Sequence, residues 1–420
     1  MRPFAEQVGR IMDAHDGHLV AGLLLIEVDQ MPQLFRLHGQ QVLDYAMDIL
    51  LERVAAACTG ADLICRFGQS QFGVFLPGLE HGGKALFVAS AIATRMQEPI
   101  EVQGRTLFVS AKIGVAVSPD DASDGPALIR NAATALDRAI RSGTASYLHY
   151  TREMREELKN RMTLEDELRA AVRHGQFVLY YQPKVAIPGG QPIGGEALLR
   201  WQHPTRGLVA PGTFIPTAEE TGLIVPIGEW VLREAVAQIR RWLDAGLPPT
   251  QIAVNVSERQ LRWGHLPALI DVLLAESGIP PHLLQLEITE TILPDDLDSA
   301  LRQMRWIADR GVALALDDFG TGYSSLSYLR ELPLDCLKVD RQFVSGMETD
   351  QRTRHIVEAI VAMAQAMDLK VVAEGIETAT QFSLLTRLGV EEGQGFLFSR
   401  PVPAEDFAQL LQRQPAGATL

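Results

Sequence analysis

Cysteine is scarce in this chain of 420 residues. There are three cysteines, Cys58, Cys65 and Cys336, and no two of them have the spacing of a metal site. An odd number of thiols without such a pattern indicates a reducing compartment rather than a disulfide-rich secreted protein. A run of roughly 20 apolar residues, which a membrane helix needs, is also missing, and the N-terminus has no signal-peptide pattern. We therefore expect a cytoplasmic location and no membrane segment in this chain.

Positive charge is scarce as well. The chain has 38 Lys and Arg residues against 52 Asp and Glu residues, which gives a formal net charge of -14 at pH 7. This balance argues against binding to a nucleic-acid polymer or to an anionic membrane surface. It is compatible with one small phosphate ligand, because a bound metal can reverse the local sign of the charge. The length of 420 residues suggests two or three domains. Hydrophobic residues make up 47% of the chain, which indicates a globular protein with an ample core.

Residues 1–150 predict a small α/β domain. Strands are expected at 20–28 and 107–117, with a short one near Tyr147, and a hairpin at 63–76 turns around Gly68–Gln71. Helices are expected at 43–57, 83–97 and 126–141. Residues 151–173 follow as a linker. They contain no Pro or Gly and have apolar residues three or four positions apart, which predicts an amphipathic helix.

Residues 174–415 alternate strand-like and helical stretches, which predicts a TIM-like (β/α)8 barrel. Strands are expected at 177–181, 194–199, 252–256, 284–288, 313–317, 336–339, 370–373 and 395–398. Helices are expected at 213–221, 228–245, 266–277, 297–310, 324–331, 351–367, 378–388 and 404–412. In such a barrel, the polar residues at the strand ends are the candidates for chemistry.

These strand ends are acidic. The apolar run Leu314–Leu316 ends in Asp317 and Asp318, and two acids at the end of a buried strand are costly unless a cation is bound there. Any single acid in such a place is more often a helix cap, a rim ion pair or a solvated turn. Here polar residues recur on successive strands, as Glu196, Asn255, Glu287, Glu290, Asp317, Asp318, Asp340, Glu374, Glu377 and Gln394.

Carboxylates crowded into one barrel mouth would repel one another and raise each other's pKa, and divalent cations would remove that conflict. Oxygen ligands without Cys or His point to Mg²⁺ or Mn²⁺ rather than to zinc. Lys338 is either a plain ion-pair partner of these acids or a group that orients an attacking water. Arg200 is suited to a phosphate oxygen.

The order of these motifs resembles the EAL family of cyclic-di-GMP phosphodiesterases. The resemblance covers about Leu164 to Leu411 and is carried by Glu196-Ala197-Leu198, Asn255, Glu287 with Glu290, Asp317–Gly322, Leu337–Asp340, Ala373–Glu377 and Gln394-Gly395-Phe396. It implies hydrolysis of cyclic di-GMP to linear pGpG with two Mg²⁺ or Mn²⁺ ions. It also implies a homodimer formed through the barrel.

The resemblance further implies a role for each matching residue. Glu196, Asn255, Glu287 and Asp317 would hold the first metal, and Asp317 would bridge to a second metal that Asp318 also binds. Lys338 and Glu374 would position and activate the water. Glu290 would anchor the loop from Phe319 to Ser325. The substrate site would be lined by Gln182, Arg200, Asp340, Glu377 and Gln394.

The first domain resembles the GGDEF, or diguanylate cyclase, family, whose domain is ferredoxin-like. Where that family has Gly-Gly-Asp-Glu-Phe, this chain has Gly68-Gln69-Ser70-Gln71-Phe72. Neutral Ser70 and Gln71 cannot hold two magnesium ions against a triphosphate, and the guanine-reading positions hold Phe35 and Arg36. The resemblance therefore implies a degenerate GGDEF domain. It is either a regulatory or dimerising module, or a packing remnant without a ligand.

Three other functions compete with this interpretation. The barrel could be a receptor that binds cyclic di-GMP without cleaving it and signals to an unidentified protein partner. The chain could be a dual enzyme that also makes cyclic di-GMP, although Ser70 and Gln71 argue against this. The barrel could also be a protein-interaction scaffold, whose partner binding would depend on neither metal nor cyclic di-GMP.

Overall fold

The computed structural model describes residues 1–14, 19–58, 63–102, 104–262, 264–290, 297–320 and 329–412. It divides into two compact units, Met1–Thr163 and Leu164–Leu420. The predicted α/β class is confirmed, with a mixed sheet in the first unit and a barrel in the second. The expected helix at 324–331 and the expected loop at 319–325 lie largely outside the described residues.

The first unit is built on a five-stranded sheet with the order β2-β3-β1-β6-β7. Central β1 pairs antiparallel with β3 and β6, and β7 adds to β6 in parallel. The strands are β1 (Ala21–Val28), β2 (Leu63–Phe67), β3 (Gln71–Leu76), β6 (Ala111–Ser118) and β7 (Tyr147–His149), and a separate hairpin is formed by β4 (Ile100–Val102) and β5 (Arg105–Leu107).

Helices cover both faces of this sheet. Successive side chains of a strand point to opposite faces, so Leu24 and Ile26 of β1 join one core, whereas Leu23 and Leu25 join another. The first core lies beneath α2 (Met31–Ala57) and α3 (Gly83–Met96), and the second lies beneath α1 (Arg2–Asp13) and α4 (Gly125–Ser142).

Two predicted elements of this unit differ from the structure. Helix α2 begins at Met31, twelve residues before the predicted start at 43, and bends at Gly39, which has a φ of 79°. The predicted strand at 107–117 is interrupted, because β5 ends at Leu107 and β6 begins at Ala111. The linker forms the predicted continuous helix as α5 (Arg152–His174).

Eight strands of the second unit close into a barrel, in the order β9-β11-β12-β13-β14-β15-β16-β8, and β8 pairs back with β9. All neighbouring pairs from β9 to β16 are parallel, whereas β8 runs antiparallel to both of its neighbours. The strands are β8 (Phe177–Ala186), β9 (Pro192–His203), β11 (Gln251–Val256), β12 (Leu284–Thr289), β13 (Ala313–Phe319), β14 (Cys336–Val339), β15 (Lys370–Ala373) and β16 (Glu392–Gln394), with the short β10 (Gly207–Val209) beside β9.

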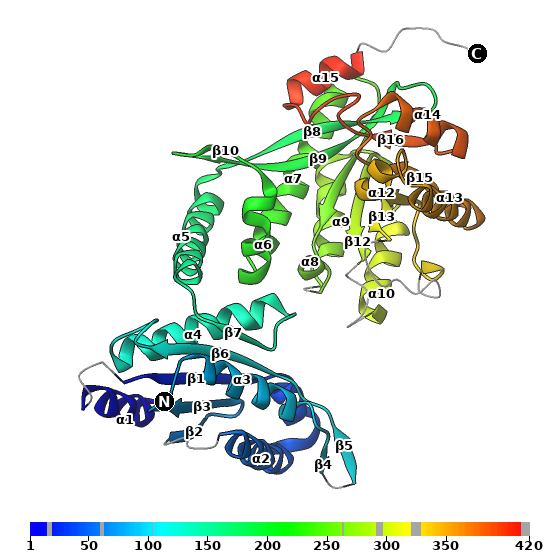
Figure 1. Cartoon of the computed structure of the whole chain (residues 1–420). Coiled ribbons are helices and arrows are strands. Elements are labelled where there is room, and N and C mark those ends of the chain that lie inside the picture. Colours follow the sequence, from blue (N-terminus) through cyan, green and yellow to red (C-terminus); the bar gives the residue numbers. More distant parts are fainter. Residues whose placement is uncertain are drawn as a thin grey trace. The chain divides into compact units, whose positions relative to one another are not determined.

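Helices pack around the outside of these strands (Figure 1). Several begin at side-chain caps that the sequence supplies: Asp350 caps one helix and Thr378 forms a capping box with Gln381 at another. The helices are α6 (Pro211–Thr221), α7 (Ile224–Asp244), α8 (Glu258–Arg262), α9 (Leu266–Ser277), α10 (Leu297–Ala308), α12 (Arg341–Gly346), α13 (Gln351–Ala366), α14 (Ala379–Leu388) and α15 (Ala404–Gln412), with a 3₁₀ turn at Pro281–Leu283.

The predicted last strand at 395–398 is wrong. The strand is β16, so Gln394 ends it rather than beginning it. Beyond Gln394 the chain turns onto the segment around Ile376, whose carbonyl accepts a hydrogen bond from Leu397 N at 2.9 Å. A Cβ at Gly395 would lie 2.1 Å from the same carbonyl oxygen, so this turn requires glycine.

Replacing Gly114 by alanine should destabilise the first unit by about 2 to 3 kcal/mol, because overpacking against rigid backbone cannot relax. A Cβ at Gly114 would lie 2.2 Å from Ala132 O and from Leu136 N of α4. All five tryptophans lie within residues 201–306, so their fluorescence reports on the barrel. We expect G114A to lower the thermal midpoint seen by circular dichroism but not the one seen by fluorescence.

The matched control is G9A, since a Cβ at this position in α1 meets nothing within 4 Å. Alanine in the interior of a helix is favoured over glycine by up to about 1 kcal/mol, so G9A should not destabilise the unit. Equal midpoints for G114A and G9A would contradict the packing argument.

Candidate active site

Each barrel strand, or the residue directly after it, carries one of the predicted site residues. Most of these side chains are buried, as expected for groups that point into a barrel. In chain order they are Gln182 on β8, Glu196 on β9, Asn255 on β11, Glu287 on β12, Asp317 on β13, Lys338 on β14, Glu374 after β15 and Gln394 on β16.

Lys338 lies at the centre of this group and is fully buried. Its ammonium is 2.6 Å from Glu287 Oε2 and 2.6 Å from Glu374 Oε1. It is also 3.1 Å from Asp317 Oδ2 and 3.9 Å from Glu196 Oε2. Burial lowers the pKa of this lysine, but the surrounding carboxylates outweigh burial and raise it well above its ordinary value. Lys338 is therefore a charged group shared by four acids.

Two amides hold the carboxylate of Glu196. Asn255 Nδ2 donates to Oε1 at 2.6 Å, and Gln394 Nε2 donates to Oε2 at 2.7 Å. Gln394 Nε2 also reaches Gln182 Oε1 at 2.9 Å, so Gln182 belongs to the same group. Burial raises the pKa of Glu196, against the effect of Lys338, and Glu287 and Asp317 raise it further. Among the residues that the structure describes, the buried Oε1 of Gln394 finds no hydrogen-bond partner, which leaves an oxygen acceptor beside the acids.

Glu287 is held by two lysines. Lys184 Nζ donates to Oε1 at 2.7 Å, and Lys338 Nζ donates to Oε2 at 2.6 Å. Burial acts to raise the pKa of Glu287, but the two ammonium groups prevail and lower it to about 2. Lys184 was not among the predicted site residues. Its signal in the sequence was a lysine two positions after Gln182 on a strand, which places both side chains on one face.

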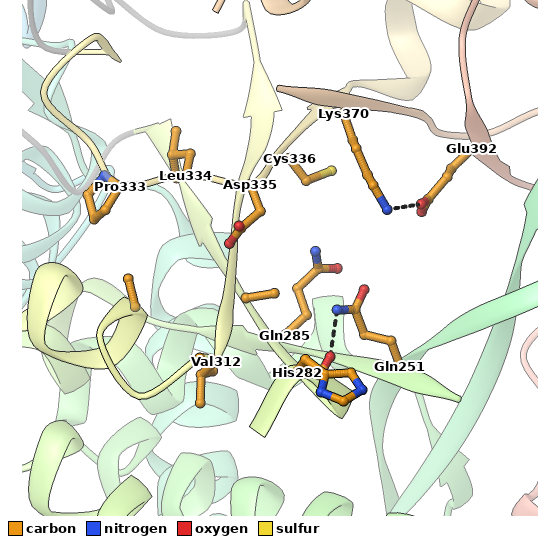
Figure 2. Close-up of a pocket in the computed structure, with 13 residues that line it drawn as sticks. Gln251, His282, Gln285, Val312, Pro333, Leu334, Asp335, Cys336, Lys370 and Glu392 are labelled. Carbon is orange, nitrogen blue, oxygen red and sulfur yellow. Dashed lines mark hydrogen bonds and ion pairs between the residues drawn. The ribbon is translucent and has the colours of Figure 1, made fainter. Parts of the chain in front are cut away.

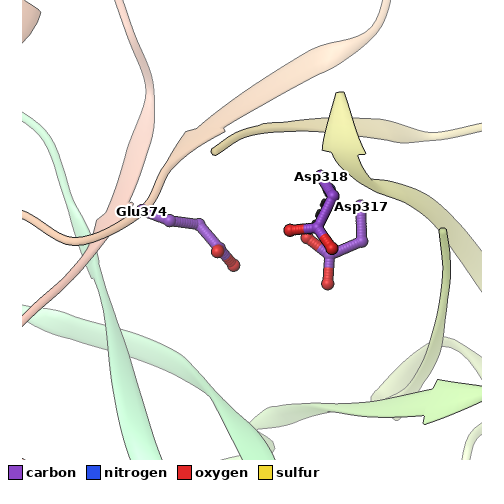
Figure 3. A group of neighbouring side chains, drawn as sticks. All are labelled: Asp317, Asp318 and Glu374. Carbon is purple, nitrogen blue, oxygen red and sulfur yellow. Dashed lines mark hydrogen bonds between the residues drawn. The ribbon is translucent and has the colours of Figure 1, made fainter. Parts of the chain in front are cut away.

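Asp317, Asp318 and Glu374 form a carboxylate cluster, in which one oxygen from each lies within 4.8 Å of the others. Figure 3 shows Asp317 and Asp318 side by side, with Glu374 pointing toward them from the opposite side. The pairing of β13 with β14 is irregular between Leu316 and Phe319, and Asp318 has a φ of 56°. This irregularity allows two consecutive acids to point into the same space.

The pKa values of this cluster reflect crowding. Burial and the charge of Asp317 raise the pKa of Asp318 to about 6. Burial raises the pKa of Glu374. Lys338 acts to lower it, and the neighbouring carboxylates act to raise it further. A divalent cation bound to these oxygens would remove the repulsion. Three carboxylates from separate strand ends therefore form a candidate site for a hard cation.

Three further predicted residues, Glu290, Asp340 and Arg200, lie around these acids, and the charge of Asp340 and a hydrogen bond with it help to raise the pKa of Asp318. Gly320 N donates to Glu290 Oε2 at 3.0 Å, where the predicted loop begins. Asp340 caps α12 by accepting from Gln342 N. Arg200 lies over the Tyr180 ring and donates to Leu199 O, and burial lowers its pKa.

A cavity of about 250 Å³ opens onto the acids. Five of the residues that line it were predicted as metal or substrate contacts and one as a catalytic residue. Arg341 and Phe396 also line it and were not predicted. Their only signal was adjacency to Asp340 and Gly395. The six predicted lining residues are Gln182, Glu196, Asp317, Glu374, Glu377 and Gln394.

A larger cavity, of about 500 Å³, lies at the other end of the barrel, where the strands begin. Figure 2 shows its lining, with Lys370 paired to Glu392 and Gln251 donating to the carbonyl of His282. None of the predicted site residues lines this cavity. The acids therefore lie at the opposite end of the strands from the larger cavity.

Two acids of the first unit, Glu27 and Asp29, also form side-chain hydrogen bonds. Gln71 Nε2 donates to Glu27 Oε2 at 2.5 Å, and Ser110 Oγ donates to Asp29 Oδ2 at 2.7 Å. Glu27 on β1 and Asp29 directly after it are thus hydrogen-bonded to neutral side chains.

Comparison with known proteins accounts for both units. The EAL domain family matches residues 165–401, which is more than half of the chain. The chain belongs to the EAL domain family. The family described as diguanylate cyclase, GGDEF domain, matches residues 2–146.

Two curated relatives of this EAL domain protein come from Pseudomonas aeruginosa. The bifunctional diguanylate cyclase/cyclic di-GMP phosphodiesterase MucR is 40% identical over 91% of this chain and 56% of that protein. The cyclic di-GMP phosphodiesterase NbdA is 36% identical over 93% of this chain and 50% of that protein. The chain therefore spans about half the length of these relatives. This EAL domain protein is homologous to cyclic-di-GMP phosphodiesterases.

A solved structure supports the barrel assignment. The PaMucR phosphodiesterase in complex with c-di-GMP is 48% identical, with a TM-score of 0.57, over 58% of this chain and 99% of that one. Among the helices of the described residues, none is long and apolar enough to cross a membrane.

Replacing Asp318 by asparagine should stabilise the metal-free protein at pH 8 but not at pH 4. The raised pKa means that ionising Asp318 opposes folding, and this penalty appears as pH rises from 3.8 toward about 6. A difference of this size corresponds to about 3 kcal/mol, which half exposure reduces to about 1 kcal/mol. Thermal melting in EDTA should show a gain of about 2–4 °C at pH 8.

The control for this measurement is D166N, which removes an exposed acid on α5. It should shift the midpoint little at either pH. A D318N gain that is equal at pH 4 and pH 8 would show that carboxylate crowding is not its cause.

Proposed function

We propose that the barrel hydrolyses cyclic di-GMP to linear pGpG with two divalent metal ions. The observation that carries this proposal is the meeting of Glu196, Glu287, Asp317 and Glu374 around Lys338 in a barrel of the EAL domain family. Four carboxylates that share one lysine carry more negative charge than this lysine balances, so the site favours the binding of further cations.

The donor set fits Mg²⁺ or Mn²⁺. All candidate ligand atoms are oxygens, which hard divalent cations prefer. The partnerless Oε1 of Gln394 adds a further oxygen next to the acids. In this proposal Glu196, Asn255, Glu287 and Asp317 hold one ion, and Asp317 and Asp318 hold the other. A pair of such ions, when bound, supplies charge stabilisation for an in-line hydrolysis of a phosphodiester.

The chain's own side chains orient the reactants in this proposal. Arg200 donates to a phosphate oxygen of the substrate, since its guanidinium matches the geometry of a phosphate. Lys338 holds the attacking water through its ammonium. Glu374, whose pKa is raised, accepts the proton of that water as its oxygen bonds to phosphorus. The bond from phosphorus to the 3′ oxygen breaks, which leaves a linear dinucleotide with a 5′ phosphate.

The substrate contacts complete the assignment. The cavity above the acids is small, but it is open to solvent at Glu377 and Phe396. We assign Gln182, Arg200, Asp340, Glu377 and Gln394 to substrate binding and Glu290 to anchoring the loop that follows Gly320. Homodimer formation through the barrel remains a prediction.

We further propose that residues 1–150 are a degenerate GGDEF domain without cyclase activity, joined by the linker 151–173 to the phosphodiesterase barrel at 174–415. Gln71 and Ser70 occupy the positions of the catalytic acids, and Gln71 is hydrogen-bonded to Glu27. A neutral amide neither balances nor coordinates a magnesium ion as a carboxylate does. The domain would act as a regulatory or dimerising module.

Replacing Glu196 by alanine should reduce the release of pGpG by more than about 100-fold, because loss of even an outer partner of a metal ligand costs 10- to 100-fold. The measurement is chromatography of cyclic di-GMP incubated with the full chain and Mg²⁺ or Mn²⁺. EDTA should abolish activity of the unchanged chain.

The control variant is E276Q, which removes an exposed acid on α9 and should retain full activity. Tight binding of cyclic di-GMP by the unchanged chain without cleavage would replace this proposal with the receptor function. Partner capture that ignores both metal and cyclic di-GMP would favour a scaffold.

Incubation with GTP and Mg²⁺ should yield no cyclic di-GMP. The assay uses the E196A chain, so that the barrel does not hydrolyse any cyclic di-GMP that is formed. Detectable synthesis would show that the first unit is an active cyclase, despite Ser70 and Gln71.

A further inference from the structure

Lys184 is a buried cation on β8 that the proposed chemistry does not use. Its side chain is 4% exposed, and its ammonium donates to Glu287 Oε1 at 2.7 Å and to Gln285 Oε1 at 2.8 Å. A lysine is almost never fully buried unless it is paired. Within the described residues, Glu287 is the one carboxylate that pairs with it. Its position therefore depends on Glu287, and the position of Glu287 depends on it.

The two lysines that hold Glu287 differ in their surroundings. Lys338 contacts Oε2 and is shared with Glu374 and Asp317, in the cluster assigned to metal binding. Lys184 contacts Oε1 and has no part in that cluster. Glu287 thus has one oxygen beside the lysine that the other acids share and the other oxygen beside a lysine that contacts no other carboxylate of the described residues.

Lys184 is also held by a residue near the end of the barrel where most strands begin, which is opposite to the acids. Gln285, two residues before Glu287 on β12, lies on the same face of the strand and accepts the second hydrogen bond of Lys184. Gln285 lines the larger cavity, where Figure 2 shows its amide. The antiparallel direction of β8 places Lys184 beside this end, while Gln182 reaches Gln394 near the acids.

We propose that Lys184 is a positioning residue for metal binding, which holds Oε1 of Glu287 and thereby keeps Oε2 on the side of Lys338 and the proposed metals. This inference rests on the proposed function, because it requires that Glu287 is a metal ligand. Outer partners of this kind fix the orientation of a ligand, and their loss weakens metal binding by 10- to 100-fold in typical cases. Without Lys184, Oε1 of Glu287 loses its hydrogen bond, so the carboxylate is free to turn and Oε2 no longer keeps one position toward the metal.

A simple charge effect would act in the opposite direction. Removing a cation makes the site more negative, which strengthens its attraction for a divalent ion. Positioning predicts weaker metal binding after the loss of Lys184, whereas charge alone predicts tighter binding. The sign of the change therefore separates the two roles.

The test is K184M, which keeps the length of the side chain and removes its charge and its donors. Binding of Mn²⁺ to the full chain is followed by electron paramagnetic resonance in the absence of substrate, so the measurement does not depend on activity. We expect the dissociation constant for Mn²⁺ to rise 10- to 100-fold relative to the unchanged chain. The matched control is K370M, which removes a largely exposed lysine at the same end of the barrel and should bind Mn²⁺ as the unchanged chain does.

A structural role is separated by thermal melting in EDTA and in Mn²⁺. A lysine that only supports the fold would lower both midpoints equally, whereas a positioning lysine reduces the gain that Mn²⁺ produces. Unchanged or tighter Mn²⁺ binding by folded K184M would overturn the inference.

A second variant decides the matter if K184M does not fold. Q285L keeps the charge of Lys184 and removes its anchor at the far end, so it should weaken Mn²⁺ binding several-fold. Unaltered binding by Q285L would then overturn the inference. Failure of the unchanged chain to bind Mn²⁺ would instead overturn the proposed metal-dependent function, and the positioning role with it.

Discussion

The buried pairing of acids with lysines is the constraint on which the barrel depends. Four carboxylates lie around Lys338, and they belong to Glu196, Glu287, Asp317 and Glu374. Lys184 pairs with the other oxygen of Glu287. Removing one partner of a buried ion pair is strongly destabilising, because the other charge is left without compensation. The interior of the barrel therefore has to be assembled as a unit, with an excess of negative charge suited to divalent cations.

The directions of the barrel strands bring these acids and lysines together. Parallel strands bring their carboxyl ends to one edge, which gathers the acids there. Among the eight barrel strands, β8 is the one that runs antiparallel to its neighbours, and it supplies Gln182 to this edge and Lys184 to the interior. The irregular pairing after Leu316 turns two consecutive acids toward the same cluster. Each departure from a regular parallel barrel thus provides a polar contact that regular strands would not provide.

The two units differ in where their acids lie. The first unit has one apolar core on each side of its sheet. Glu27 on β1 and Asp29 directly after it are hydrogen-bonded to Gln71 and Ser110. Nothing in that arrangement, among the residues that the structure describes, presents an excess of buried negative charge comparable to that of the barrel. Its cores depend on close packing, as at Gly114.

The sequence by itself determined the alternation of strands and helices, the two-part organisation and the acids at the strand ends, because apolar runs, caps and motif order are local properties. Only the tertiary structure decided the direction of β8, the end of the last strand at Gln394 and the positions of Lys184 and Arg341. Lys184 and Glu287 are 103 residues apart, and no local pattern states that they meet. Their pairing follows from the closure of the barrel, which brings distant strands together around one buried charge.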